Sequence, residues 1–112
     1  MIKPSIYVCD WKNILSYYNS IEDKYNLIQG DEEKPVLIDG IKGVIYHSPP
    51  LYIPRVLDFI RDSADKSLPI VVQSRRISEL RELLDIGNVN TESVFLIKSY
   101  PELFARVHDI FS

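Results

Sequence analysis

The sequence predicts an α/β domain built on a parallel sheet, and three observations lead to that prediction. Strand-like and helix-like stretches alternate along the chain, the strand-like stretches are apolar almost throughout, and 112 residues suffice for one hydrophobic core. Strands that are apolar throughout are typical of parallel sheets, because helices bury both of their faces. We therefore expect a single domain over residues 1–112, with a flavodoxin-like, doubly wound sheet of five strands and helices on both faces.

The first part of the chain begins with one strand and one helix. Ser5–Cys9 is a compact β-branched and aromatic run, and from Trp11 to Tyr25 apolar residues recur at helical spacing. Asp10 lies between the two elements and is the expected N-cap of the helix, because its carboxylate can accept a backbone N–H.

The pattern is less regular in the next part of the chain. We expect a short strand over Asn26–Gln29 and a solvated loop over the charged residues 31–34. Residues 36–38 fit either a helical turn or a strand. Val44–His47 then predicts a buried third strand, which ends at a serine and two prolines.

The remaining chain carries the clearest patterns. Leu68–Gln73 is the strongest strand signal, and Ser93–Lys98 predicts the last strand. Gly87 is expected to stop one helix, and Ser99-x-x-Glu102 is a capping box that begins another. The apolar stripes of the helices in this part lie over Ile53–Ala64, Ile77–Leu84 and Leu103–Phe111.

Composition excludes several classes of function. The charged fraction is 26% and the net charge is −3, so the chain lacks the basic excess that nucleic-acid binding needs. No apolar run is long enough to cross a membrane. The single cysteine, Cys9, fits a reducing compartment and the interior of a strand. We expect a cytoplasmic protein that binds neither membranes nor, by this domain alone, nucleic acid.

Polar residues follow the strands at the ends where the functional crevice of such sheets lies. They are Asp10, His47, Ser74 and Lys98. An acid after the first strand, a hydroxyl after the fourth and a lysine after the fifth resemble the receiver domain of two-component response regulators. The resemblance covers the whole chain in element order. It is best where LPIVVQSRR and VFLIKSYPELFARVHDIF match the last two strands and the last helix.

The resemblance implies a role for each of these positions. Asp10 would take one of the two acidic metal-binding positions, Ser74 would supply the hydroxyl that contacts the phosphoryl group, and Lys98 would pair with that group. Phe95, three residues before the lysine, would match the aromatic residue that reports activation in many receivers.

The chain departs from the receiver pattern at positions that carry the chemistry. Trp11 stands where a second acid is usual, and the third strand ends on Tyr46 and His47 where the phosphoacceptor aspartate is usual. Arg75 replaces a small residue after the hydroxyl. An acyl phosphate needs a carboxylate nucleophile, and Mg²⁺ needs two or more hard oxygen ligands. We therefore expect a pseudo-receiver that is not an enzyme and has no catalytic residues, metal or cofactor.

Several of these residues also have simple structural interpretations. Ser74 is expected to satisfy a nearby backbone group, and Lys98 either pairs with Asp10 or points into solvent. A lone histidine without a second ligand at metal-binding spacing predicts a loop or helix-entry role for His47. His108 is expected on the surface of the last helix.

These features favour a phosphorylation-independent signalling module. It would bind a histidine kinase or an effector domain, or form a dimer. In receivers the fourth helix, fifth strand and last helix carry output and dimerisation. By resemblance, the interface residues are Arg81, Glu82, Asp85, Phe95, Tyr100 and Arg106.

Two alternatives stay open. The chain is a phosphorylatable receiver if VLIDG is the third strand and Asp39 is the acceptor. It is a small flavodoxin-like ligand-binding domain if the crevice takes a metabolite or a nucleotide. Against the latter, CDWKN after the first strand lacks the glycine-rich pattern of phosphate-binding loops.

Overall fold

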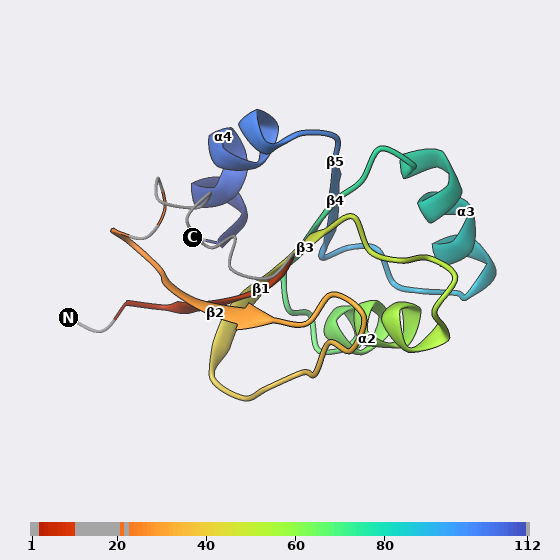
Figure 1. The fold of residues 1–112 in the computed structure, drawn as a ribbon, viewed down its shortest axis with the longest axis horizontal. Coiled ribbons are helices and arrows are strands. Elements are labelled where there is room, and N and C mark those ends of the chain that lie inside the picture. Colours follow the sequence, from red (N-terminus) through yellow and green to blue (C-terminus); the bar gives the residue numbers. More distant parts are fainter. Residues whose placement is uncertain (1–2, 11–20, 22, 112) are drawn as a thin grey trace.

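The computed structural model describes residues 3–10, 21 and 23–111, apart from the side chain of Tyr100. In this part of the chain, five parallel strands form one sheet in the order β2-β1-β3-β4-β5 (Figure 1). The strands are β1 (Ser5–Cys9), β2 (Asn26–Gly30), β3 (Ile41–His47), β4 (Ile70–Gln73) and β5 (Val94–Ile97). The described helices are α2 (Pro54–Asp65), α3 (Ile77–Ile86) and α4 (Tyr100–Phe111). The prediction of an α/β fold with a five-stranded parallel sheet is confirmed.

The helix predicted after β1 falls largely outside the described residues, and so does its expected capping by Asp10. The last two positions of its apolar stripe, Ile21 and Tyr25, are buried. The Tyr25 hydroxyl lies 3.4 Å from Nδ1 of His108, which is exposed on α4 as predicted. None of the helices in the described residues is long and apolar enough to span a lipid bilayer.

Buried apolar side chains form two clusters, one on each face of the sheet. Alternate residues of each central strand belong to alternate clusters. Successive strand residues point to opposite faces, and in β3 Val44 and Tyr46 belong to one cluster while Ile45 belongs to the other. Side chains of α2 and α3 pack in the first cluster and those of α4 in the second. Figure 1 accordingly shows α2 and α4 on different sides of the strands.

Gly43 in β3 allows α4 to lie close to the sheet. A Cβ atom at this position would collide with the ring of Phe111 and would lie 3.0 Å from the carbonyl oxygen of Pro69. Since Phe111 is only 1% exposed, its ring has little room to move away. The absence of a side chain at Gly43 is therefore a packing requirement of the α4 face.

Residues 31–40 connect β2 to β3 without forming a helix or a strand, so both expectations for residues 36–38 are wrong. The Tyr46 hydroxyl donates a hydrogen bond to the Glu32 carbonyl, and the Tyr7 hydroxyl accepts one from the Val36 N–H at 3.2 Å. Leu37 and Ile38 of the connection pack against the cluster that contains both tyrosines. Local hydrogen bonds from the Glu33 and Lys34 N–H groups to Asp31 Oδ1 hold its start, and tertiary contacts hold the rest.

Asp39 lies in an exposed turn that precedes β3. The alternative in which VLIDG forms the third strand is contradicted, because Ile41–His47 is the strand that pairs with both β1 and β4. Asp39 is thus at the amino end of β3, roughly 20 Å along the strand from its carboxyl end.

The predicted helix ends are largely found. Ser99 caps α4, since its hydroxyl accepts the Glu102 N–H at 3.4 Å. α3 stops at Gly87 as expected, but Gly87 has a φ of −79°. The left-handed conformation falls instead on Asn88, with a φ of 52°. Asparagine tolerates that conformation better than most residues.

Candidate functional site

The predicted site residues lie together at the end of the sheet where the strands have their carboxyl ends, here called the carboxyl edge. β1, β3, β4 and β5 are successive neighbours in the sheet, and the register aligns His47 with Gln73 and Gln73 with Ile97. The predicted residues that immediately follow or end these strands are Asp10, His47, Ser74 and Lys98.

A network of hydrogen bonds centred on Gln73 joins the ends of β3, β4 and β5. The Gln73 carbonyl accepts the Ser48 N–H at 2.6 Å, and its side-chain Oε1 accepts the Ser48 hydroxyl at 3.3 Å. Its Nε2 donates to the Lys98 carbonyl at 2.7 Å. Sequence reasoning assigned no role to Gln73, although a polar residue at the end of the most apolar strand was the available signal.

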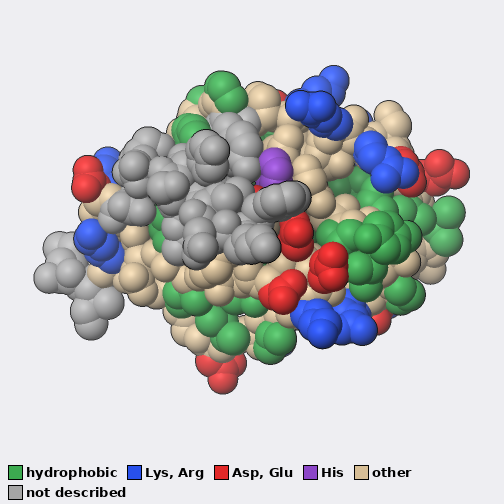
Figure 2. All heavy atoms as spheres, viewed as in Figure 1, with side chains coloured by type: hydrophobic (Ala, Val, Ile, Leu, Met, Phe, Trp, Pro, Cys, Tyr) green, Lys and Arg blue, Asp and Glu red, His purple; other side chains and the backbone are tan. Residues whose placement is uncertain are grey.

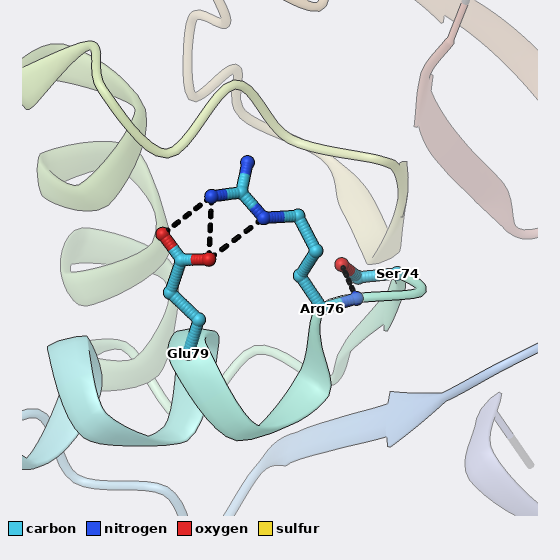
Figure 3. A network of polar contacts seen from close by, with 3 residues as sticks. All are labelled: Ser74, Arg76 and Glu79. Carbon is cyan, nitrogen blue, oxygen red and sulfur yellow. Dashed lines mark hydrogen bonds and ion pairs between the residues drawn. The ribbon is translucent and has the colours of Figure 1, made fainter.

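Ser74 satisfies a nearby backbone N–H group, as predicted. Its hydroxyl accepts the Arg76 N–H at 3.0 Å just before α3 begins (Figure 3). The Arg76 side chain turns to Glu79, with Nη2 2.5 Å from Oε2 and Nε 2.7 Å from the same carboxylate oxygen. Arg76 is therefore engaged by a carboxylate on α3, whereas Arg75 is exposed at the crevice.

The β1 side of the edge is acidic. Asp10 is 2% exposed, and Glu32 from the connecting segment lies near it, half-buried. Burial and then the negative charge of Asp10 raise the pKa of Glu32, while neighbouring His47 acts in the opposite direction. Figure 2 shows acidic side chains gathered beside a histidine on one face. Residues 31–34 form a loop, as expected, in which Glu32 is partly buried and the other three residues are exposed.

Two buried side chains near the strand ends, Tyr46 and Cys9, are withdrawn from solvent. Tyr46 is fully buried, and its burial raises the pKa of its hydroxyl. Burial likewise raises the pKa of the Cys9 thiol, which fits the predicted interior position. Trp11 lies outside the described residues.

The β4–β5 side of the edge contains an open hollow of about 490 Å³. Lys98 is exposed there, and the ion pairs among the described residues do not join it to Asp10. Pro101 at the start of α4 forms part of the wall. The other lining residues are His47, Ser48, Gln73, Arg75, Lys98 and Ser99.

A second open hollow, of about 270 Å³, lies between α3 and β5 and includes two of the predicted interface residues. Its lining residues are Arg81, Leu84, Asp85, Thr91, Val94 and Leu96. On the other side of β5, the guanidinium of Arg106 lies 5.9 Å from the centre of the Phe95 ring. Glu82 is exposed on α3, and the side chain of Tyr100 lies outside the description.

The arrangement limits the chemistry that this edge can perform. β3 ends on His47 and is followed by Ser48, so its carboxyl end presents no carboxylate that could form an acyl phosphate. Among the described residues, no group of three or more His, Cys, Asp or Glu side chains is placed to hold a metal ion. Comparison of the chain with protein-family models, curated proteins and solved structures finds no match in any of them.

Proposed function

We propose that this chain is a flavodoxin-like pseudo-receiver, a cytoplasmic signalling module that acts through protein contacts and without phosphorylation. One observation carries the proposal. In the strand order β2-β1-β3-β4-β5, an acid, a hydroxyl and a lysine follow β1, β4 and β5 as in receivers, while β3 ends on His47. The scaffold of the site is kept and its nucleophile is replaced.

The surroundings of the site also argue against phosphotransfer. The Ser74 hydroxyl accepts a backbone N–H before α3, and an exposed arginine, Arg75, follows it where receivers have a small residue. Signalling by this domain would then depend on which protein it binds.

The surface formed by α3, β5 and α4, here called the β5 face, is the proposed interface. β5 lies at one edge of the sheet, opposite β2, and the hollow beside it combines apolar Val94 and Leu96 with charged Arg81 and Asp85. A mixed patch of this kind suits an interface, in which an apolar centre is surrounded by charges that select the partner. The partner is a second copy of this chain, or a histidine kinase or effector domain.

The dimer form of this proposal is tested by sedimentation velocity over a range of concentrations. We expect concentration-dependent dimerisation of the wild-type chain, and its loss in Arg81→Glu, because the substitution reverses a charge on the β5 face. Arg55→Glu is the matched control, since Arg55 is an exposed arginine on α2 and the net charge changes equally. A monomer at all concentrations, or equal dimerisation of both variants, would overturn self-association through this face.

A further inference from the structure

The hollow at the carboxyl ends of β3, β4 and β5 has two cationic side chains in its lining. Arg75 and Lys98 both line it and are exposed. Among the described residues neither side chain forms an ion pair, and no Asp or Glu is a lining residue. Two like charges that border one hollow repel each other, and an anion between them would relieve this repulsion.

Hydroxyl groups in fixed positions complete the lining. Ser48 has a left-handed φ of 45°, and its backbone and side chain are both bonded to Gln73. Ser99 is fixed as the cap of α4. A serine hydroxyl rotates and can donate to an anion as well as accept from the protein. The Ser48 hydroxyl already donates to Gln73, so the hollow offers two cations and one available hydroxyl donor, that of Ser99 at the start of α4.

Three acidic residues lie near this hollow but are not among its lining residues. Asp10 and Glu32 belong to the β1 side, with His47 between them and the cations. Glu102, in the first turn of α4, accepts the Lys98 N–H at 3.3 Å and lies 3.9 Å from Arg106. Its carboxylate is a competing negative charge at the margin, not a ligand of either lining cation.

We propose that this hollow binds a small phosphate ester without forming a covalent bond to it. The guanidinium of Arg75 suits two oxygens of a phosphate, and Lys98 adds a compact charge. A volume of about 490 Å³ exceeds the need of a bare phosphate and falls in the range of small-molecule sites. The non-phosphate part of the ligand lies toward Pro101 and the open side.

The test is an amide-resolved NMR titration at constant ionic strength, with glycerol 3-phosphate as probe. Comparison with inorganic phosphate shows what the glycerol part of the ester contributes to the affinity. Comparison with acetate shows whether the site prefers a phosphate group to another anion. We expect saturable shifts at residues 47–48, 75 and 98–99, with tighter binding of the ester than of inorganic phosphate and weakest binding of acetate. Arg75→Ala and Lys98→Ala should each weaken binding of the ester about tenfold.

Two further variants make the test specific. Arg76→Ala removes the adjacent arginine, which Glu79 engages, and should leave the affinity unchanged. Glu102→Gln removes the marginal carboxylate and should tighten binding. The proposal is overturned if shifts are spread over the surface without saturation, or if Arg75→Ala, Lys98→Ala and Arg76→Ala bind the ester equally well. A well-dispersed spectrum of each variant shows that it is folded. Neither result bears on the β5 face.

Discussion

Glu32 is a half-buried carboxyl group near the buried Asp10, so its ionisation is opposed by burial and by a like charge. Its pKa in the folded protein is raised above the ordinary value of about 4.3. The folded state therefore holds this proton more tightly than the unfolded state does. Protonated Glu32 therefore stabilises the folded state relative to ionised Glu32. This stabilisation is fully present below the pKa that Glu32 has in the unfolded chain, and it is lost as the pH rises through the pKa in the folded protein.

We predict from this that Glu32→Gln stabilises the protein at neutral pH, by no more than about 1 kcal/mol given the partial exposure of the side chain. At a pH below about 4 both carboxyl and amide are neutral, so the advantage should disappear. Urea unfolding of both proteins, at neutral pH and at a pH below about 4, measures the difference in the free energy of unfolding. Glu82→Gln, at an exposed position on α3, is the control. A neutral-pH stability of Glu32→Gln below that of the wild type would contradict this account of the acidic pair.

At the scale of elements, the connection between β2 and β3 is the least regular part of the described fold. It lacks helical hydrogen bonds, and tyrosine hydroxyls from β1 and β3 bind its backbone at Val36 and Glu32. Tyr46 is fully buried, so removal of its hydroxyl leaves the Glu32 carbonyl without this donor. The connection thus depends on contacts with the sheet.

We predict that Tyr46→Phe lowers the free energy of unfolding by about 1 kcal/mol, because the part-buried Glu32 carbonyl loses its hydrogen-bond donor. Amide hydrogen exchange should become faster over residues 31–38 and stay unchanged in α3. Tyr52→Phe is the matched control, since Tyr52 is 80% exposed. Equal stability and equal exchange in Tyr46→Phe and the wild type would show that the hydroxyl does not hold the connection.

For the molecule as far as the structure describes it, the strands and helices could be predicted largely from local patterns. β1 is found over the predicted residues, and α4 begins at the predicted capping box, because apolar periodicity and capping are properties of short segments. The edge at which Asp10, His47, Ser74 and Lys98 gather also follows, since parallel strands end together. Their prediction does not require knowing which side chains are in contact in the folded protein.

The rest depends on register and on contacts between distant segments. Glu32 and Tyr46 are 14 residues apart, and only the tertiary path of the connection brings them together. Gln73 joins three strand ends only when the register between β3, β4 and β5 is known. The charged run at residues 31–34 likewise gives no local sign that one of its acids turns inward.

For the whole molecule, we propose a receiver-like fold in which the site that receivers phosphorylate has no nucleophile. Incubation of the full chain with acetyl phosphate and Mg²⁺, followed by intact-mass analysis, tests it most directly. Asp39→Asn runs beside the wild type, because Asp39 was the other candidate acceptor. We predict an unchanged mass for both proteins. A stoichiometric phosphoryl adduct on the wild type that survives acid and is lost in base would be an acyl phosphate, and would contradict the claim.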